Sequence, residues 1–75
     1  MKVGDLVYYI SSADGKKVYT VIKEITTSGN PIKIWGNWYH NKKEALKDKE
    51  TLHLSHMYKE DCILEHTTWK KRYSK

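Results

Sequence analysis

Three short runs of β-branched and aromatic residues, each followed by a turn or loop signal, constrain the fold of this chain most strongly. They cover residues 6–10, 18–25 and 32–39. Runs of this length and composition are typical of strands. Asp14-Gly15 stands between the first two runs and predicts a tight hairpin. The first half of the chain therefore predicts an antiparallel β structure.

The faces of these strands follow from the alternation of side chains along an extended chain. On the second strand, Tyr19, Val21 and Ile25 can share a face if a small irregularity falls between Val21 and Ile25. On the third strand, Trp38 shares a face with Ile32 and Ile34 and is predicted to enter the core. The opposite face takes Lys33, Trp35 and Tyr39.

The second half of the chain changes period and then returns to strands. Asn41 is a good N-cap for a short helix over residues 42–49, which Leu46 would hold to the body. A fourth strand follows with Leu52 and Leu54 inward. A single 3₁₀ turn over residues 58–61 and a last strand over 62–66 complete the predicted order.

Three stretches, "KVGDLVYY", "YTVIKEI" and "MYKEDCIL", resemble the SH3-like small barrels of the KOW and Tudor-type group. The resemblance lies in a Val-Gly-Asp start, a Thr-Val-x-x-Ile second strand and a one-turn 3₁₀ helix with Asp before the last strand. It covers roughly residues 2–64 and implies a mainly β, SH3-like antiparallel barrel of about five strands. The helix between the third and fourth strands departs from this pattern, which leaves the strand pairing open.

Length and composition divide the chain into one domain and a tail. Its 75 residues predict a single domain, residues 1–66. A domain of this size buries only about 60% of the surface that its unfolded chain exposes. Residues 67–75 predict a basic, flexible C-terminal tail. We find no signal peptide and no apolar run long enough for a membrane span, so we expect a cytoplasmic protein without membrane contact.

Charge is unevenly distributed along the chain. The formal net charge is +5, but the last ten residues hold four basic side chains and no acid. The first 65 residues hold ten basic and nine acidic side chains. Arg72 is the single arginine. Lysine suits loose contact with phosphate as a point charge, whereas arginine is the better reader of guanine edges. Base-specific recognition of DNA is therefore disfavoured.

Aromatic residues beside lysines form the candidate partner-binding surface. Trp35 and Tyr39 either cover the helix or the end of the barrel, or they stand exposed, where they could stack a base or anchor a protein contact. The tail is either a solvated end or a short arm that contacts an acidic partner. The predicted partner-binding residues are Lys33, Trp35, Tyr39, Lys42, Lys43, Trp69, Lys70, Lys71 and Arg72.

Histidine and cysteine side chains raise the question of metal binding and catalysis. His53, His56, Cys62 and His66 are zinc-ligand types, but their spacing matches no known zinc motif. We predict surface histidines, a buried apolar cysteine and no metal. Nucleophile elbows, phosphate loops and dinucleotide fingerprints are absent, so we expect no enzyme, no cofactor and no small-molecule substrate.

The sequence thus favours a non-catalytic binding module. We expect a small accessory or inhibitor-like regulatory protein that docks on a protein partner. Its small size, its many lysines and its lack of catalytic motifs resemble bacteriophage accessory proteins, which implies a host factor as one such partner. The alternative is non-specific nucleic-acid binding through the lysines, the aromatic surface and the basic tail.

Overall fold

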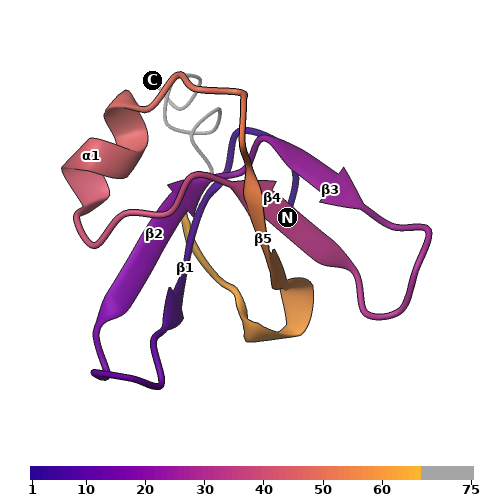
Figure 1. The fold of residues 1–75 in the computed structure, drawn as a ribbon, viewed down its shortest axis with the longest axis horizontal. Helices are drawn as coiled ribbons and strands as arrows, with labels where there is room; N and C mark the ends of the chain where they lie inside the picture. The colour runs from indigo at the N-terminus through magenta and orange to yellow at the C-terminus, as the bar shows by residue number, and fades with distance from the viewer. Residues whose placement is uncertain (67–75) are drawn as a thin grey trace.

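The computed structural model describes residues 1–66 and shows a mainly β protein with one short helix. Two three-stranded antiparallel sheets, with orders β2-β1-β6 and β3-β4-β5, make up its body (Figure 1). Within the described residues the strand ladders remain two separate sheets and do not close into one barrel. The elements are β1 Leu6–Ile10, β2 Lys17–Val21, β3 Glu24–Thr26, β4 Lys33–Gly36, α1 Lys42–Lys47, β5 Ser55–Tyr58, the 3₁₀ helix η1 Lys59–Asp61 and β6 Ile63–His66.

The predicted Asp-Gly hairpin joins β1 to β2. Gly15 has a φ of 71°, a left-handed conformation that glycine adopts without strain. The Oδ1 atom of Asp14 accepts a hydrogen bond of 3.1 Å from the backbone N–H of Lys16, which fixes the turn. From this turn the strands pair from Ile10 opposite Lys17 to Leu6 opposite Val21.

An irregularity does fall between Val21 and Ile25, and it divides the second predicted strand between the two sheets. The N–H of Ile22 donates to the carbonyl of Asp5 at 2.9 Å, beside β1. The N–H of Lys23 donates to the carbonyl of Trp35 at 2.9 Å, on β4. The chain therefore leaves one sheet and enters the other at this point, and the structure has six strands where the sequence predicted about five.

The core lies where the inner faces of the two sheets meet. Its buried members are Val7, Ile22, Ile34 and Cys62. Trp38 packs against this cluster, and its indole N–H donates to the carbonyl of Ser55 at 3.1 Å. The prediction that Trp38 completes the core is therefore confirmed. Ile25 and Met57 pack against the same cluster from β3 and β5.

The short helix begins as predicted but ends earlier and uses a different anchor. Asn41 is the N-cap, and its side chain accepts hydrogen bonds from the N–H groups of Lys43 and Glu44. The helix stops at Lys47 rather than at residue 49. Leu46 is 44% exposed, whereas Ala45 is fully buried, so the prediction that Leu46 holds the helix was wrong. The small Ala45 side chain lets the helix lie close to the body.

The segment before β5 was predicted with the wrong phase. Leu52 is 67% exposed, so the prediction that it points inward was wrong, and Leu54 is half-buried. His53 has a φ of 60°, which interrupts any extended run, and the strand begins only at Ser55. Alternation from Leu52 and Leu54 would have placed His56 inward, but it is Met57 that packs against the core.

In the part of the chain that the structure describes, no helix has the length and apolar character needed to cross a membrane.

Candidate functional site

The sheet β3-β4-β5 has one face packed on the core and one face turned away from it. Ile25, Ile34 and Met57 stand opposite one another in the register and pack inward. Side chains alternate along a strand, so their neighbours point to the other side. This other side, here called the outer sheet face, carries Glu24, Thr26, Lys33, Trp35, His56 and Tyr58.

Three rings run in a row across the outer sheet face. The ring centroids of Trp35 and His56 are 4.8 Å apart, and those of His56 and Tyr58 are 5.7 Å apart. His56 and Tyr58 are exposed and Trp35 is half-buried. The Trp35 indole N–H donates to the hydroxyl of Thr26 at 2.8 Å, which fixes the indole in place. The row is therefore a largely pre-set aromatic surface that is open to a partner.

The charges on the outer sheet face nearly balance. Lys33 is its one lysine and Glu24 its one carboxylate. Lys33 lies between Thr26 and Tyr58 in the register, and Glu24 lies opposite Trp35. With one charge of each sign, the surface is mainly aromatic in character.

Only two of the predicted partner-binding residues in the described part of the chain share this face. Lys33 and Trp35 lie on it as expected, two residues apart on β4. Tyr39 does not, because β4 ends at Gly36 and the chain then turns toward β2. There the backbone of Tyr39 pairs with Tyr19 through two hydrogen bonds of 2.6 and 2.8 Å. The predicted grouping of Tyr39 with Trp35 was therefore wrong.

The helix lysines also lie apart from the aromatic row. Lys42 and Lys43 belong to α1, which packs against β2 of the other sheet, whereas the row lies on β4 and β5 (Figure 1). The Lys42 ammonium forms an exposed ion pair of 2.8 Å with Glu65. That contact raises the pKa of Lys42. The other four predicted residues, Trp69, Lys70, Lys71 and Arg72, lie outside the described residues.

Sequence reasoning missed His56 and Tyr58, which supply two of the three rings. The signal was present in the spacing, because both flank Met57 and stand two residues apart. Had the strand been started at Ser55, alternation would have placed Met57 inward and both rings outward. The wrong phase assigned to residues 52–57 concealed them.

The Tyr39 hydroxyl instead belongs to a network around Asp48, which ends the helix. Asp48 has only 3% of its side chain exposed. Its carboxylate accepts hydrogen bonds from the Tyr39 hydroxyl at 2.8 Å and from the Asn37 amide at 3.1 Å. It also accepts one from the N–H of Glu50 at 3.2 Å, and the Lys23 ammonium lies 3.5 Å away. This network joins the end of α1 to the link between β2 and β3 and to the segment that follows β4.

Replacing Asp48 with asparagine is expected to flatten the dependence of stability on acid pH. Burial alone raises the pKa of Asp48, but the donors and the Lys23 charge outweigh it and hold the pKa below 3.8. A lowered folded-state pKa contributes stability that is complete above about pH 3.8 and is lost as the pH falls through the folded value. Urea unfolding across this range should show a steeper loss for the wild type than for Asp48→Asn. Asp14→Asn, in the exposed hairpin turn, is the control. If the unfolding free energies of the wild type and of Asp48→Asn changed equally with pH, the network would be contradicted.

Cys62 is predicted to be unreactive in the folded protein. Its side chain belongs to the buried core, and burial followed by the nearby Asp61 charge raises its pKa to about 11. The thiolate is the reactive form of cysteine, so little of it exists near neutral pH. An aromatic disulfide reagent at mildly alkaline pH should modify Cys62 slowly in buffer and fully in urea. Rapid modification in buffer would show that the thiol is accessible.

His53 and His56 lie on the surface, whereas Cys62 lies in the core. His56 contributes to the aromatic row, and His53 lies in the exposed segment before β5. In residues 1–66, as far as their side chains are described, no three His, Cys, Asp or Glu side chains converge as a metal-binding group would.

Comparison of the chain with protein-family models, with curated proteins and with solved structures finds no significant match.

Proposed function

We propose that this chain is a non-catalytic binding module that docks on a protein partner through the outer sheet face. The observation that supports this best is the row of Trp35, His56 and Tyr58 on an open sheet. Trp and Tyr are enriched among the residues that dominate protein interfaces. Rings already held in place lose little conformational freedom when a partner covers them.

The balance of charge favours a protein over a nucleic acid as the partner. A surface that tracks a phosphate backbone needs several unpaired cations. The outer sheet face offers one lysine, Lys33, and also carries one glutamate, Glu24. Two lysines elsewhere, Lys23 and Lys42, are engaged by Asp48 and Glu65.

Nucleic-acid binding is the second candidate, and two observations favour it. The three rings have the flat shape on which bases stack, and the whole chain carries a net charge of +5. In this case the lysines and the basic residues 67–75 would meet phosphate. The affinity would then fall steeply with salt, by a log–log slope of about −0.7 for each phosphate of a single strand.

We further infer that the two sheets are the halves of an SH3-like small barrel. Three features of the topology support this. β1 pairs with both β2 and β6, the chain passes from β2 to β3 with a short break, and η1 leads into the last strand. The helix α1 is then an insertion between two strands of one half.

The proposed function is tested by a pull-down experiment. Three forms of the chain are immobilised, and the proteins that each form retains from a nuclease-treated cell extract are compared. The forms are the wild type, Tyr58→Ala and Leu64→Ala, whose exposed side chain lies on the other sheet. A protein retained by the wild type and by Leu64→Ala but not by Tyr58→Ala, and confirmed to bind after purification, would support docking through the outer sheet face. A partner retained equally by all three forms would contradict it.

A further inference from the structure

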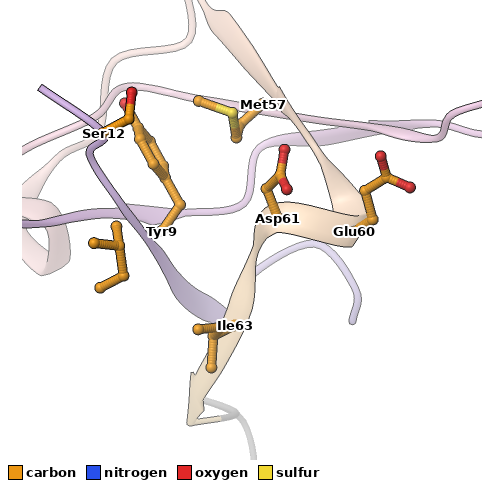
Figure 2. A pocket seen from close by; sticks show the side chains of 7 residues that line it. Tyr9, Ser12, Met57, Glu60, Asp61 and Ile63 are labelled. Carbon is orange, nitrogen blue, oxygen red and sulfur yellow. The ribbon is translucent and has the colours of Figure 1, made fainter. Parts of the chain in front are cut away.

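We infer that a hollow between β1, η1 and β6 binds an extended segment of a protein partner that carries a lysine or arginine among apolar residues. The hollow, here called the acidic hollow, has a volume of about 500 Å³. Its main lining residues are Tyr9, Ile10, Met57, Glu60, Asp61 and Ile63 (Figure 2). It uses none of the outer sheet face residues, so it adds a second contact surface to the proposed function.

The apolar side of the hollow is lined by residues from β1, β5 and β6. Ile10 is 50% exposed and Ile63 is 47% exposed, although both are large and apolar. Met57 packs on the core, and the Tyr9 ring packs edge-on against Trp38 at 5.2 Å. Exposed apolar side chains gathered around a hollow are a feature of interaction sites. The volume lies within the range of ~300–1,000 Å³ that is usual for binding sites.

The polar side of the hollow carries two carboxylates and no cation. Glu60 and Asp61 both come from η1 and are exposed (Figure 2). None of the residues that line the hollow is a lysine or an arginine. Within the described part of the chain, neither carboxylate has a basic nitrogen within 4.0 Å. In a chain of net charge +5, this is a local surface of the opposite sign.

These two sides together fit the side chain of lysine or arginine. Such a side chain places its aliphatic stem on apolar surface and its charged end in a polar setting. The stem would lie on Ile10 and Ile63, and the charged end would reach Glu60 and Asp61. Because the carboxylates lie near solvent, their attraction for a cation is moderate and depends on salt. Apolar contact must supply the rest of the affinity.

The strands beside the hollow favour an extended peptide over a small cation. β5 and β6 are each the last strand of their sheet in residues 1–66, so each has one side without a strand partner. Edge strands of this kind bind extended segments through backbone hydrogen bonds. A segment that alternates apolar and basic residues would place side chains in the hollow while its backbone follows the edge.

The test is an NMR titration of the isotope-labelled full chain with the peptide acetyl-Leu-Lys-Leu-Lys-Leu-amide. We expect shifts centred on the residues that line the hollow. The double variant Glu60→Gln/Asp61→Asn should bind at least about tenfold more weakly, while Glu44→Gln/Glu50→Gln, which removes two exposed carboxylates elsewhere, should bind as the wild type does. A matched peptide with norleucine in place of lysine should bind the wild type as weakly as the lysine peptide binds the double variant.

Several results would overturn the inference. No binding of the lysine peptide, equal binding by the double variant, or equal binding of the norleucine peptide would each do so. Shifts spread over acidic residues across the whole surface would show simple charge attraction. Tyr58→Ala should leave this titration unchanged, because Tyr58 lies on the outer sheet face. Loss of the outer-face partner with retention of peptide binding, or the reverse, therefore separates the two proposals.

Discussion

Gly36→Ala is expected to destabilise the protein by about 1–3 kcal/mol, a typical penalty for an added methyl group in a well-packed core. Gly36 is buried at the end of β4, where β4 meets β2. A Cβ atom there would meet the hydroxyl of Thr20 well inside van der Waals contact. It would also lie 3.2 Å from Thr20 Cγ2 and 3.2 Å from the carbonyl oxygen of Val21.

Thr20 has little room to move away from such a methyl group. Its side chain is fully buried, and its hydroxyl donates to the carbonyl of Asn37 at 2.6 Å. Displacing the hydroxyl would leave a buried polar group unpaired, so we expect a loss near the upper end of that range. A 75-residue domain has a total stability of roughly 4–11 kcal/mol, so the change is a large part of it.

Urea unfolding followed by tryptophan fluorescence measures this effect, with Gly29→Ala as the matched control. A Cβ at Gly29 meets nothing within 4 Å, so that variant should stay within about 0.5 kcal/mol of the wild type. Combining Gly36→Ala with Thr20→Ala should lose less stability than the sum of the two single changes, because the second change makes room for the first. Equal stability of Gly36→Ala and Gly29→Ala would contradict the close approach of the two sheets.

Tyr58→Ala is expected to weaken partner binding by at least about 30-fold, or about 2 kcal/mol, which is the usual threshold for a dominant interface residue. The Tyr58 ring is exposed and lies at the end of the aromatic row next to His56. Its side chain caps no helix, although its backbone precedes η1. The unfolding free energy should therefore change by less than about 0.5 kcal/mol, as for other surface substitutions.

The control for Tyr58→Ala is Leu64→Ala, which removes an exposed apolar side chain from the other sheet. It should bind the partner as the wild type does. Titration calorimetry with the purified partner gives the affinities, and urea unfolding gives the stabilities. If both variants lose affinity equally, the interface is not centred on the outer sheet face.

Much of the local structure could be predicted because it depends on neighbouring residues. The Asp14-Gly15 turn and the Asn41 cap each satisfy nearby backbone groups, so their sequence signals are strong. The break after Val21 lies where the sequence needed an irregularity for Tyr19, Val21 and Ile25 to share a face. The 3₁₀ turn at Lys59–Asp61 also occurs as predicted.

The errors arose where contacts distant in sequence decide the outcome. Leu46 has the larger apolar surface, but where α1 packs against β2 the buried side chain is Ala45 and Leu46 stays exposed. Tyr39 leaves the outer sheet face because Gly36 must pack against Thr20, which ends β4 and redirects the chain. The left-handed conformation of His53 shifts the phase of β5, and in the sequence only the spacing of His56 and Tyr58 around Met57 reflects that phase. Of the six residues on the outer sheet face, the sequence therefore predicted only Lys33 and Trp35 as part of the site.

The most direct test of the central claim is the affinity of the purified partner for the wild type and for Tyr58→Ala, measured between about 50 and 200 mM salt. Docking through the aromatic row predicts a large loss for Tyr58→Ala at every salt concentration and a wild-type affinity that changes little with salt. A steep decline of wild-type affinity with salt, together with no loss for Tyr58→Ala, would contradict the claim. Binding would then depend on the lysines rather than on the outer sheet face.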